Sequence, residues 1–280
     1  MTVPAQSVPI ETLPLFAELD RLLLALLRSL TPADWQRPTL ARQWTVKDVA
    51  AHLLDGNLRP LSMLRDGHFG EAPAETSCAG LVACLNRLNA DWVRAARRLS
   101  PAVLIELLAQ SGAEYTAFLN TLDPWSPAAF SVAWAGETQS LNWFHMARDY
   151  TEKWHHQQQI SAAVGQAAPL MEPPLFRPFI ETLMRGLPPA YRAVAAPVGA
   201  LVQVVSDGKA GGCRGLATAG GWHLPPPGAT TPAAAVTLAP ADAWQLFTKG
   251  LSAAEARERA QVAGDEDLAM AALRMVAVMG

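Results

Sequence analysis

Residues 148–160 concentrate side chains that can bind a metal ion. The segment reads RDYTEKWHHQQQI and holds a glutamate and two of the chain's six histidines. On an α-helix at about 100° per residue, Glu152 and His156 lie about 40° apart around the axis, whereas His155 points about 100° away from His156. A carboxylate and an imidazole one turn apart can share one cation, and both reach zinc at roughly 2.0–2.2 Å. The spacing therefore predicts that one histidine of the pair faces the glutamate.

Further polar residues lie on or near the same side of this helix. His145 lies about 20° from both Glu152 and His156, and Asp149 falls on the same side. Arg148 lies about 60° from His145. We consider Asp149 as a candidate general base and Arg148 as a candidate partner for a substrate anion. Either residue could equally serve in a salt bridge or beside the site without touching the substrate.

A catalytic metal site usually takes three protein ligands and keeps one position open, so another element must supply a third ligand. His52, in the segment DVAAHLLD, is the best candidate because alanines and leucines surround it in an expected helix. Asp48 and Asp55 lie on a neighbouring face, where either could accept the second ring N–H of this histidine and fix its tautomer. Carboxylate and imidazole ligands suit zinc, and also iron, nickel or manganese.

The elements that must position these residues are apolar-periodic segments in the first part of the chain. Helices are expected within residues 13–30, 45–67, 78–100, 101–122 and 140–164. Thr45 and Asp48 fit the N-cap and N3 positions of a capping box. Pro60 predicts a kink or break near residues 58–59. A helix bundle is the expected architecture for such a series of helices.

The pattern changes after residue 165. Prolines and a glycine in AVGQAAPLMEPPLF indicate a boundary, which divides the chain into residues 1–165 and 166–280. Alternation and β-branched residues predict strands in ALVQVVSDG, CRGLATAGGW and AAAVTL. The segments ADAWQLFTKG, SAAEARERA and DEDLAMAALRMVAVMG are expected to be helical. The second part therefore reads as a small α+β domain.

The composition is that of a soluble globular protein. Of 280 residues, 50% are hydrophobic and 17% are charged, with a net charge of −3. The basic residues form no stripe, so no nucleic-acid partner is expected. No apolar run reaches the roughly 18 residues of a membrane helix, so no membrane partner is expected either. Three cysteines without a C-x-x-C spacing and an N-terminus unlike a signal peptide predict a cytoplasmic protein. A homodimer is compatible with these features.

Two motifs resemble those of the DinB-like metal-binding four-helix bundles. The segment PTLARQWTVKDVAAHLLDGNLRPLS holds a W-x-V-x-D-x-x-A-H-L motif, and HMARDYTEKWHHQQQI holds an E-x-x-x-H motif. Within these bundles the sequence is most similar to the mycothiol-dependent maleylpyruvate isomerase branch. The resemblance covers residues 10–165, and the remainder is more loosely similar to the sterol-carrier-like domain of that branch. It implies an all-α four-helix bundle of the up-down-down-up type, followed by a smaller α+β domain.

The resemblance also implies a metal site and a cofactor. It makes His52, Glu152 and His156 a triad for a divalent metal ion, zinc first and nickel or iron as alternatives. The cofactor it implies is mycothiol or another low-molecular-weight thiol, and the substrate is an electrophilic small molecule.

Three other residues are weaker candidates for binding the cofactor or the substrate. Trp44 belongs to the first motif, and Arg59 lies on the side of His52. Arg214 is a candidate for the arginine with which the C-terminal domain of that branch is expected to hold substrate carboxylates.

Three hypotheses follow for the activity. In the leading one, a thiol that is deprotonated by the metal adds to an electrophilic carbon, and an isomerase uses rotation about the resulting single bond before elimination. The second is metal-assisted hydrolysis, with Asp149 or Asp55 as a general base. The third is a non-catalytic protein that binds a metal ion, or an apolar ligand in its C-terminal domain.

Overall fold

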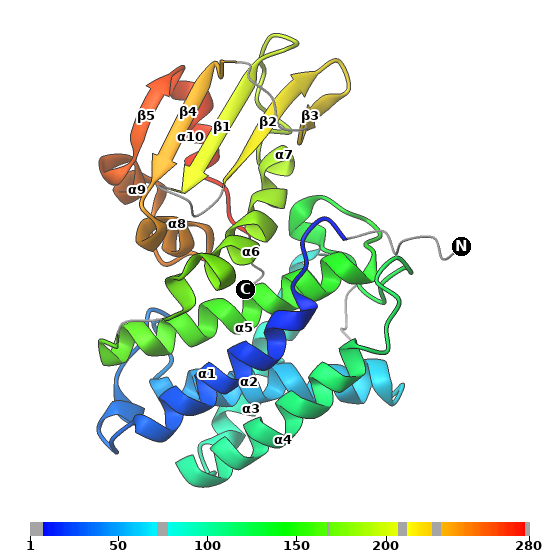
Figure 1. Cartoon of the computed structure of the whole chain (residues 1–280), viewed down its shortest axis with the longest axis vertical. Coiled ribbons are helices and arrows are strands. Elements are labelled where there is room, and N and C mark those ends of the chain that lie inside the picture. The colour runs from blue at the N-terminus through cyan, green and yellow to red at the C-terminus, as the bar shows by residue number, and fades with distance from the viewer. Residues whose placement is uncertain (1–7, 72–77, 167–168, 207–211, 226–230, 278–280) are drawn as a thin grey trace.

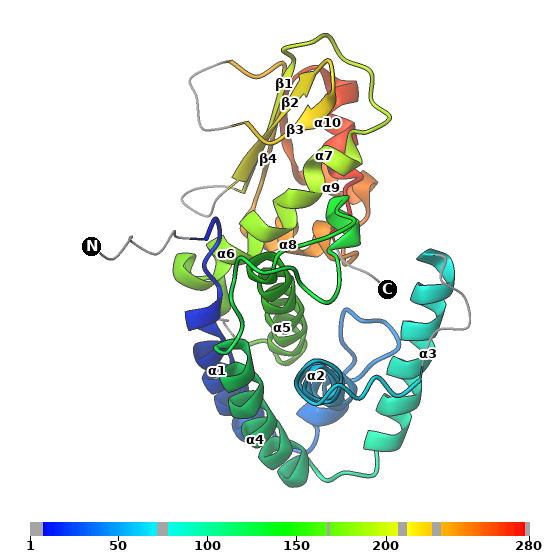
Figure 2. The same cartoon turned by 90° about the vertical axis from the view of Figure 1, so that its right-hand side faces the viewer.

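The computed structural model describes residues 8–71, 78–166, 169–206, 212–225 and 231–277. The N-terminal part consists mainly of helices (Figure 1), namely α1 (Phe16–Ser29), α2 (Val46–Pro60), α3 (Cys78–Ala96), α4 (Pro101–Leu119) and α5 (Asn142–Val164). α2 packs against α4 and α5, and α1 packs against the same two helices. These four helices form the predicted bundle, while α3 packs on α2 at its side (Figure 2). Among the described residues, no helix combines the length and the apolar character needed to cross a lipid bilayer.

Local sequence signals set the start and the end of α2. The side chain of Thr45 accepts a hydrogen bond from the backbone N–H of Asp48, whose carboxylate accepts the N–H of Thr45 in return. The predicted capping box is therefore confirmed. The α-helix ends at Pro60, and a π-helical turn, Leu61–Arg65, continues it. Proline has no N–H to donate and its ring crowds the preceding turn, which explains why the regular hydrogen-bond pattern changes there.

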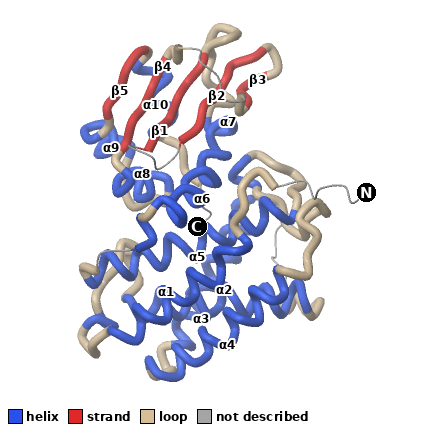
Figure 3. The backbone as a smooth tube through the Cα atoms, viewed as in Figure 1, coloured by secondary structure: helices blue, strands red, loops and turns tan. Residues whose placement is uncertain are grey.

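The C-terminal part is the smaller α+β domain that the sequence predicts (Figure 3). Its strands are β1 (Leu201–Ser206), β2 (Gly212–Thr218), β3 (Gly221–His223), β4 (Ala234–Leu238) and β5 (Gln261–Gly264). They form one sheet in the order β3-β2-β1-β4-β5, in which β1 and β4 run parallel and the other neighbours antiparallel. Its helices are α6 (Pro173–Leu183), α7 (Leu187–Ala190), α8 (Pro240–Phe247), α9 (Ala253–Arg259) and α10 (Glu266–Leu273).

Strand β5 was not predicted. The segments SAAEARERA and DEDLAMAALRMVAVMG were expected to be helical, and no strand was expected between them, where β5 pairs antiparallel with β4. Gly264 ends this strand with φ +82°, and a Cβ at this position would lie 2.1 Å from the carbonyl oxygen of Ala233. Only glycine fits so close an approach, so the strand can turn directly into the next helix. Four residues at a sheet edge are too few to show a period of two.

The two parts of the chain share one hydrophobic core. The ring of Trp154, on α5, stacks on Phe179 at a centroid distance of 3.9 Å. The same indole meets Phe176 of α6 at 5.7 Å and Trp244 of α8 at 6.1 Å. Its N–H donates to the carbonyl oxygen of Leu170. α5 therefore packs against bundle helices on one side and against the C-terminal part on the other, and most of its length is buried.

Candidate metal centre

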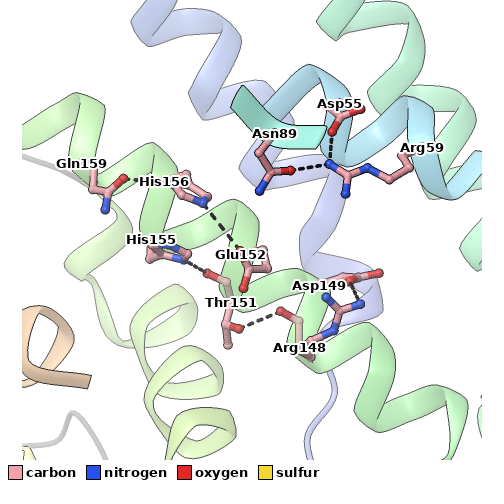
Figure 4. A network of polar contacts seen from close by, with 10 residues as sticks. All are labelled: Asp55, Arg59, Asn89, Arg148, Asp149, Thr151, Glu152, His155, His156 and Gln159. Carbon is pink, nitrogen blue, oxygen red and sulfur yellow. Dashed lines mark hydrogen bonds and ion pairs between the residues drawn. The ribbon is translucent and has the colours of Figure 1, made fainter. Parts of the chain in front are cut away.

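Three side chains from two helices meet between α2 and α5. His52 comes from α2, whereas Glu152 and His156 come from α5, and their potential ligand atoms all lie within 4.8 Å of one another. The rings of His52 and His156 approach edge to face with centroids 4.6 Å apart. Nε2 of His156 is 3.6 Å from Oε2 of Glu152, and Figure 4 shows these two groups facing each other across one turn of α5. The structure thus brings together the three residues that the sequence singles out as candidate ligands.

The electrostatic state of this triad suits a cation. Burial lowers the pKa of His52 well below its ordinary value, so that its imidazole is neutral. Burial by itself would raise the pKa of Glu152, but the interactions with His156, His155 and Arg148 together outweigh it and lower this pKa. Nδ1 of His52 is buried and has no hydrogen-bond partner among the described residues. Metal ligands must be deprotonated, and a buried nitrogen without a partner is unfavourable, so this donor set fits a divalent ion such as zinc.

Trp44 and His155 lie next to the triad in different ways. The ring of Trp44, just before α2, lies 4.9 Å from that of His52 and 6.3 Å from that of His156. His155 stacks on His156 at 3.9 Å, but its Nδ1 contacts the carbonyl oxygen of Thr151 at 2.9 Å. Burial lowers the pKa of His155 to about 4, which keeps it neutral. As predicted, only one histidine of the pair faces the glutamate.

Arg148 and Asp149 are bound to each other and to two further side chains. Nη2 of Arg148 lies 2.6 Å from Oδ1 of Asp149 and 3.0 Å from Nε2 of His145. The second oxygen of Asp149 accepts a short hydrogen bond from the hydroxyl of Tyr115. Burial and the charge of Asp149 raise the pKa of Tyr115 well above its ordinary value, so this hydroxyl keeps its proton. Both oxygens of Asp149 are therefore engaged.

Arg59 lies two turns after His52 on α2. Its Nη2 donates to the carboxylate of Asp55 and, at 2.7 Å, to Oδ1 of Asn89 on α3 (Figure 4). Its charge acts on His52 and contributes to the lowered pKa of that imidazole, after burial and His156. Arg59 is thus close enough to influence the triad electrostatically while its guanidinium is held by neighbours.

The prediction that Asp48 or Asp55 accepts a hydrogen bond from the ring of His52 is wrong. Asp48 accepts hydrogen bonds from Nε and Nη2 of Arg97 at 2.9 and 3.0 Å in addition to its role in the capping box. Asp55 pairs with Arg59. Guanidinium groups offer both carboxylates stronger, charge-assisted hydrogen bonds than a neutral imidazole does.

One residue that touches the triad was not predicted. Oε1 of Gln159 lies 2.9 Å from Nδ1 of His156, and both side chains are buried. The signal was present in the sequence, because residues three apart on a helix are neighbours and HHQQQ contains this spacing.

Arg214 lies on β2, where its partner across the ladder is Gln203 of β1. The conformation of its side chain falls outside the described part of the structure. The sheet lies on the far side of α6 and α8 from α2 (Figure 1), so the structure does not bring this strand to the triad.

A four-helix bundle with a His-Glu-His cluster and an appended α+β domain defines a protein of the DinB-like class. The chain belongs to the mycothiol maleylpyruvate isomerase family, because the family model described as its N-terminal domain matches residues 16–161. A solved structure of the mycothiol-dependent maleylpyruvate isomerase aligns with a TM-score of 0.51 and 13% identity, over 84% of this chain and 86% of that chain. The solved structure of a histidine-to-alanine mutant of the mycothiol-dependent maleylpyruvate isomerase aligns with a TM-score of 0.52 and 12% identity, over 90% of this chain and 91% of that chain. At these identities the likeness establishes the fold. No curated protein sequence matches the chain.

Proposed function

We propose that this protein is a metal- and thiol-dependent isomerase or S-transferase whose divalent ion, zinc first, is held by His52, Glu152 and His156. The observation that carries the proposal is the convergence of these donors within 4.8 Å. Three protein ligands with room for a fourth are typical of catalytic zinc, and the side chain of Glu152 keeps 33% of its surface exposed. Membership of the family and the likeness to mycothiol-dependent maleylpyruvate isomerase support mycothiol, or a related thiol, as cofactor. They also support maleylpyruvate or a similar electrophile as substrate.

A zinc ion at the triad would supply the positive charge that keeps a bound thiol as a thiolate. His52 remains neutral because burial disfavours its protonated form, and Glu152 remains charged beside Arg148. The ring of Trp44 lies beside the two imidazoles, at 4.9 and 6.3 Å from their centroids. Arg148 keeps 23% of its side chain exposed, so its charge can attract an anionic substrate toward the site.

The isomerisation needs no reactant besides the thiol and the substrate. The thiol sulfur adds to one carbon of a conjugated double bond, and the electron pair of that bond moves onto the adjoining carbonyl. The former double bond is now a single bond and rotates. The electron pair then returns and expels the same sulfur, which leaves the other geometric isomer and the unchanged thiol. Such a reaction needs no cysteine of the protein.

Metal-assisted hydrolysis has less support. It requires a carboxylate that is free to accept a proton from water. Asp149 is bound by Arg148 and Tyr115, and Asp55 by Arg59. Each candidate base is thus already held in an ion pair with an arginine.

Metal content tests the proposal directly. We expect about one zinc ion per chain in the purified protein, with most of it lost in a His156→Ala variant because two ligands bind far more weakly than three. His155→Asn is the matched control. The imidazole of His155 contacts the backbone carbonyl of Thr151, so it should be dispensable for metal binding. After cobalt substitution, addition of mycothiol should give a sulfur-to-cobalt charge-transfer band, and isomerisation of maleylpyruvate should require both thiol and metal. Equal zinc content in wild type and His156→Ala would refute the site.

A further inference from the structure

The three glutamines after the histidine pair are all buried, although glutamine is usually exposed. Gln157 contacts the backbone of α1 at Leu19 and Leu23. Oε1 of Gln158 has no hydrogen-bond partner within the described residues. Gln159 alone reaches the triad, through His156. We propose that Gln159 is a positioning residue that fixes the tautomer of His156 and so presents Nε2 of this imidazole to the metal. The inference rests on the proposed metal site.

The contact with Gln159 favours one ring nitrogen of His156 as the carrier of the proton. An amide oxygen only accepts hydrogen bonds, so the nitrogen 2.9 Å from Oε1 of Gln159 must be the donor. A neutral imidazole has one N–H and one lone pair, and the proton on Nδ1 leaves the lone pair on Nε2. Nε2 is the nitrogen of His156 that lies 3.6 Å from Glu152. The hydrogen bond and the direction toward the triad therefore agree.

Burial makes this hydrogen bond difficult to replace. His156 and Gln159 expose only 9% and 7% of their surfaces, so water has little access to Nδ1. Without Gln159, either ring nitrogen could carry the proton, and one of the two neutral tautomers would turn an N–H toward the triad. Outer hydrogen-bond partners of metal-bound histidines typically raise metal affinity by about 10–100-fold. Glutamine achieves this without adding a second negative charge next to Glu152.

Zinc affinity provides the first test. In chelator competition at neutral pH, Gln159→Leu should weaken zinc binding by about 10–100-fold. Gln159→Glu should restore the affinity, because a carboxylate also accepts from Nδ1–H. Gln158→Leu is the matched control, with the same change at the next buried position of the same helix, and should bind zinc as the wild-type protein does. Melting temperatures of the metal-free variants check that each one folds.

The tautomer provides a test that does not depend on metal binding. Nitrogen NMR of ¹⁵N-histidine-labelled, metal-free protein should show the proton of His156 on Nδ1 in the wild type and a tautomer mixture in Gln159→Leu. A wild-type proton on Nε2, or unchanged zinc affinity in Gln159→Leu, would overturn the role of Gln159. If the wild type binds no zinc but has the Nδ1–H form in a Gln159-dependent manner, the metal proposal fails and the hydrogen-bond assignment stands.

Discussion

A buried ion pair joins α1 to α5 beside the candidate site. Nζ of Lys153 lies 2.5 Å from Oδ1 of Asp20, and the two side chains expose only 10% and 17% of their surfaces. The ammonium group also lies over the rings of Phe16 and Tyr115, at 5.7 and 5.9 Å from their centroids. Because Lys153 follows Glu152 directly, this pair anchors the turn of α5 that carries a proposed ligand.

Replacing Asp20 with alanine would leave the ammonium of Lys153 buried without a carboxylate. Breaking a buried ion pair costs about 3–5 kcal/mol. The remaining exposure of both groups and the two aromatic faces that stay in contact place Asp20→Ala at the lower end, about 3 kcal/mol. Glu18→Ala on the same helix is the matched control. Its pair with Arg21 is exposed, at 42% and 63%, and such pairs contribute about 0–1 kcal/mol.

Urea unfolding, followed by tryptophan fluorescence, measures the loss of unfolding free energy in each variant. The comparison requires that the dependence of this free energy on urea concentration is the same in both variants and the wild type. A double variant, Asp20→Leu with Lys153→Met, removes both charges and should recover most of the stability, because apolar residues can replace a buried ion pair. The reasoning would be refuted if Asp20→Ala lost no more than Glu18→Ala. It would also be refuted if the double variant were as unstable as Asp20→Ala, since the loss would then come from packing.

Three further predictions concern single residues. A Cβ on Gly112 would lie 2.7 Å from Oδ2 of Asp20. Gly112→Ala should therefore lower the unfolding free energy by about 1–3 kcal/mol in the wild type and by clearly less in Asp20→Ala, which a double-mutant cycle in urea measures. Asp48→Ala removes the capping box and the pair with Arg97, and a thermal unfolding loss of about 1–3 kcal/mol is expected. Burial lowers the pKa of His145, so stability should fall as pH drops below about 6.5, and His145→Asn should reduce that slope.

Each of these three has a result that would contradict it. For Gly112, an equal loss in both backgrounds would exclude the contact with the carboxylate as its cause. For Asp48, a loss no greater than that of an exposed control would mean that the cap adds nothing to α2. For His145, the unfolded chain takes up a proton on acidification that the buried imidazole refuses. Equal pH slopes in wild type and variant would therefore show that His145 titrates normally in the folded protein.

The sequence was informative where local geometry decides the outcome. Helical spacing predicted that Glu152 and His156 share one side of α5, and local sequence signals predicted the cap of α2. Pro60 predicted a kink or break near residues 58–59, and α2 instead runs to Pro60 and continues as a π-helical turn. His52 was proposed as the third ligand from the alanines and leucines around it, and the two motifs of the family supported that choice, because spacing within one helix does not show which helix faces it. Strand β5 escaped prediction since its pairing with β4 depends on an edge supplied by a distant part of the chain.

Hydrogen-bond partners were the least predictable feature of the site. The carboxylates nearest to His52 in sequence looked suitable, yet Arg97, just after α3, and Arg59 on α2 bind them. Their positions depend on how the helices pack, and a guanidinium outcompetes a neutral ring.

The appended domain contributes to the site without a described contact to the triad. Trp154 lies about 160° around α5 from both Glu152 and His156, and this opposite side is the one that α6 and α8 cover. That cover makes α5 a helix enclosed on both sides, so its polar groups must find partners within the protein. Lys153 finds Asp20, and His156 finds Gln159. The same enclosure excludes water from the imidazoles and favours their neutral, metal-binding form.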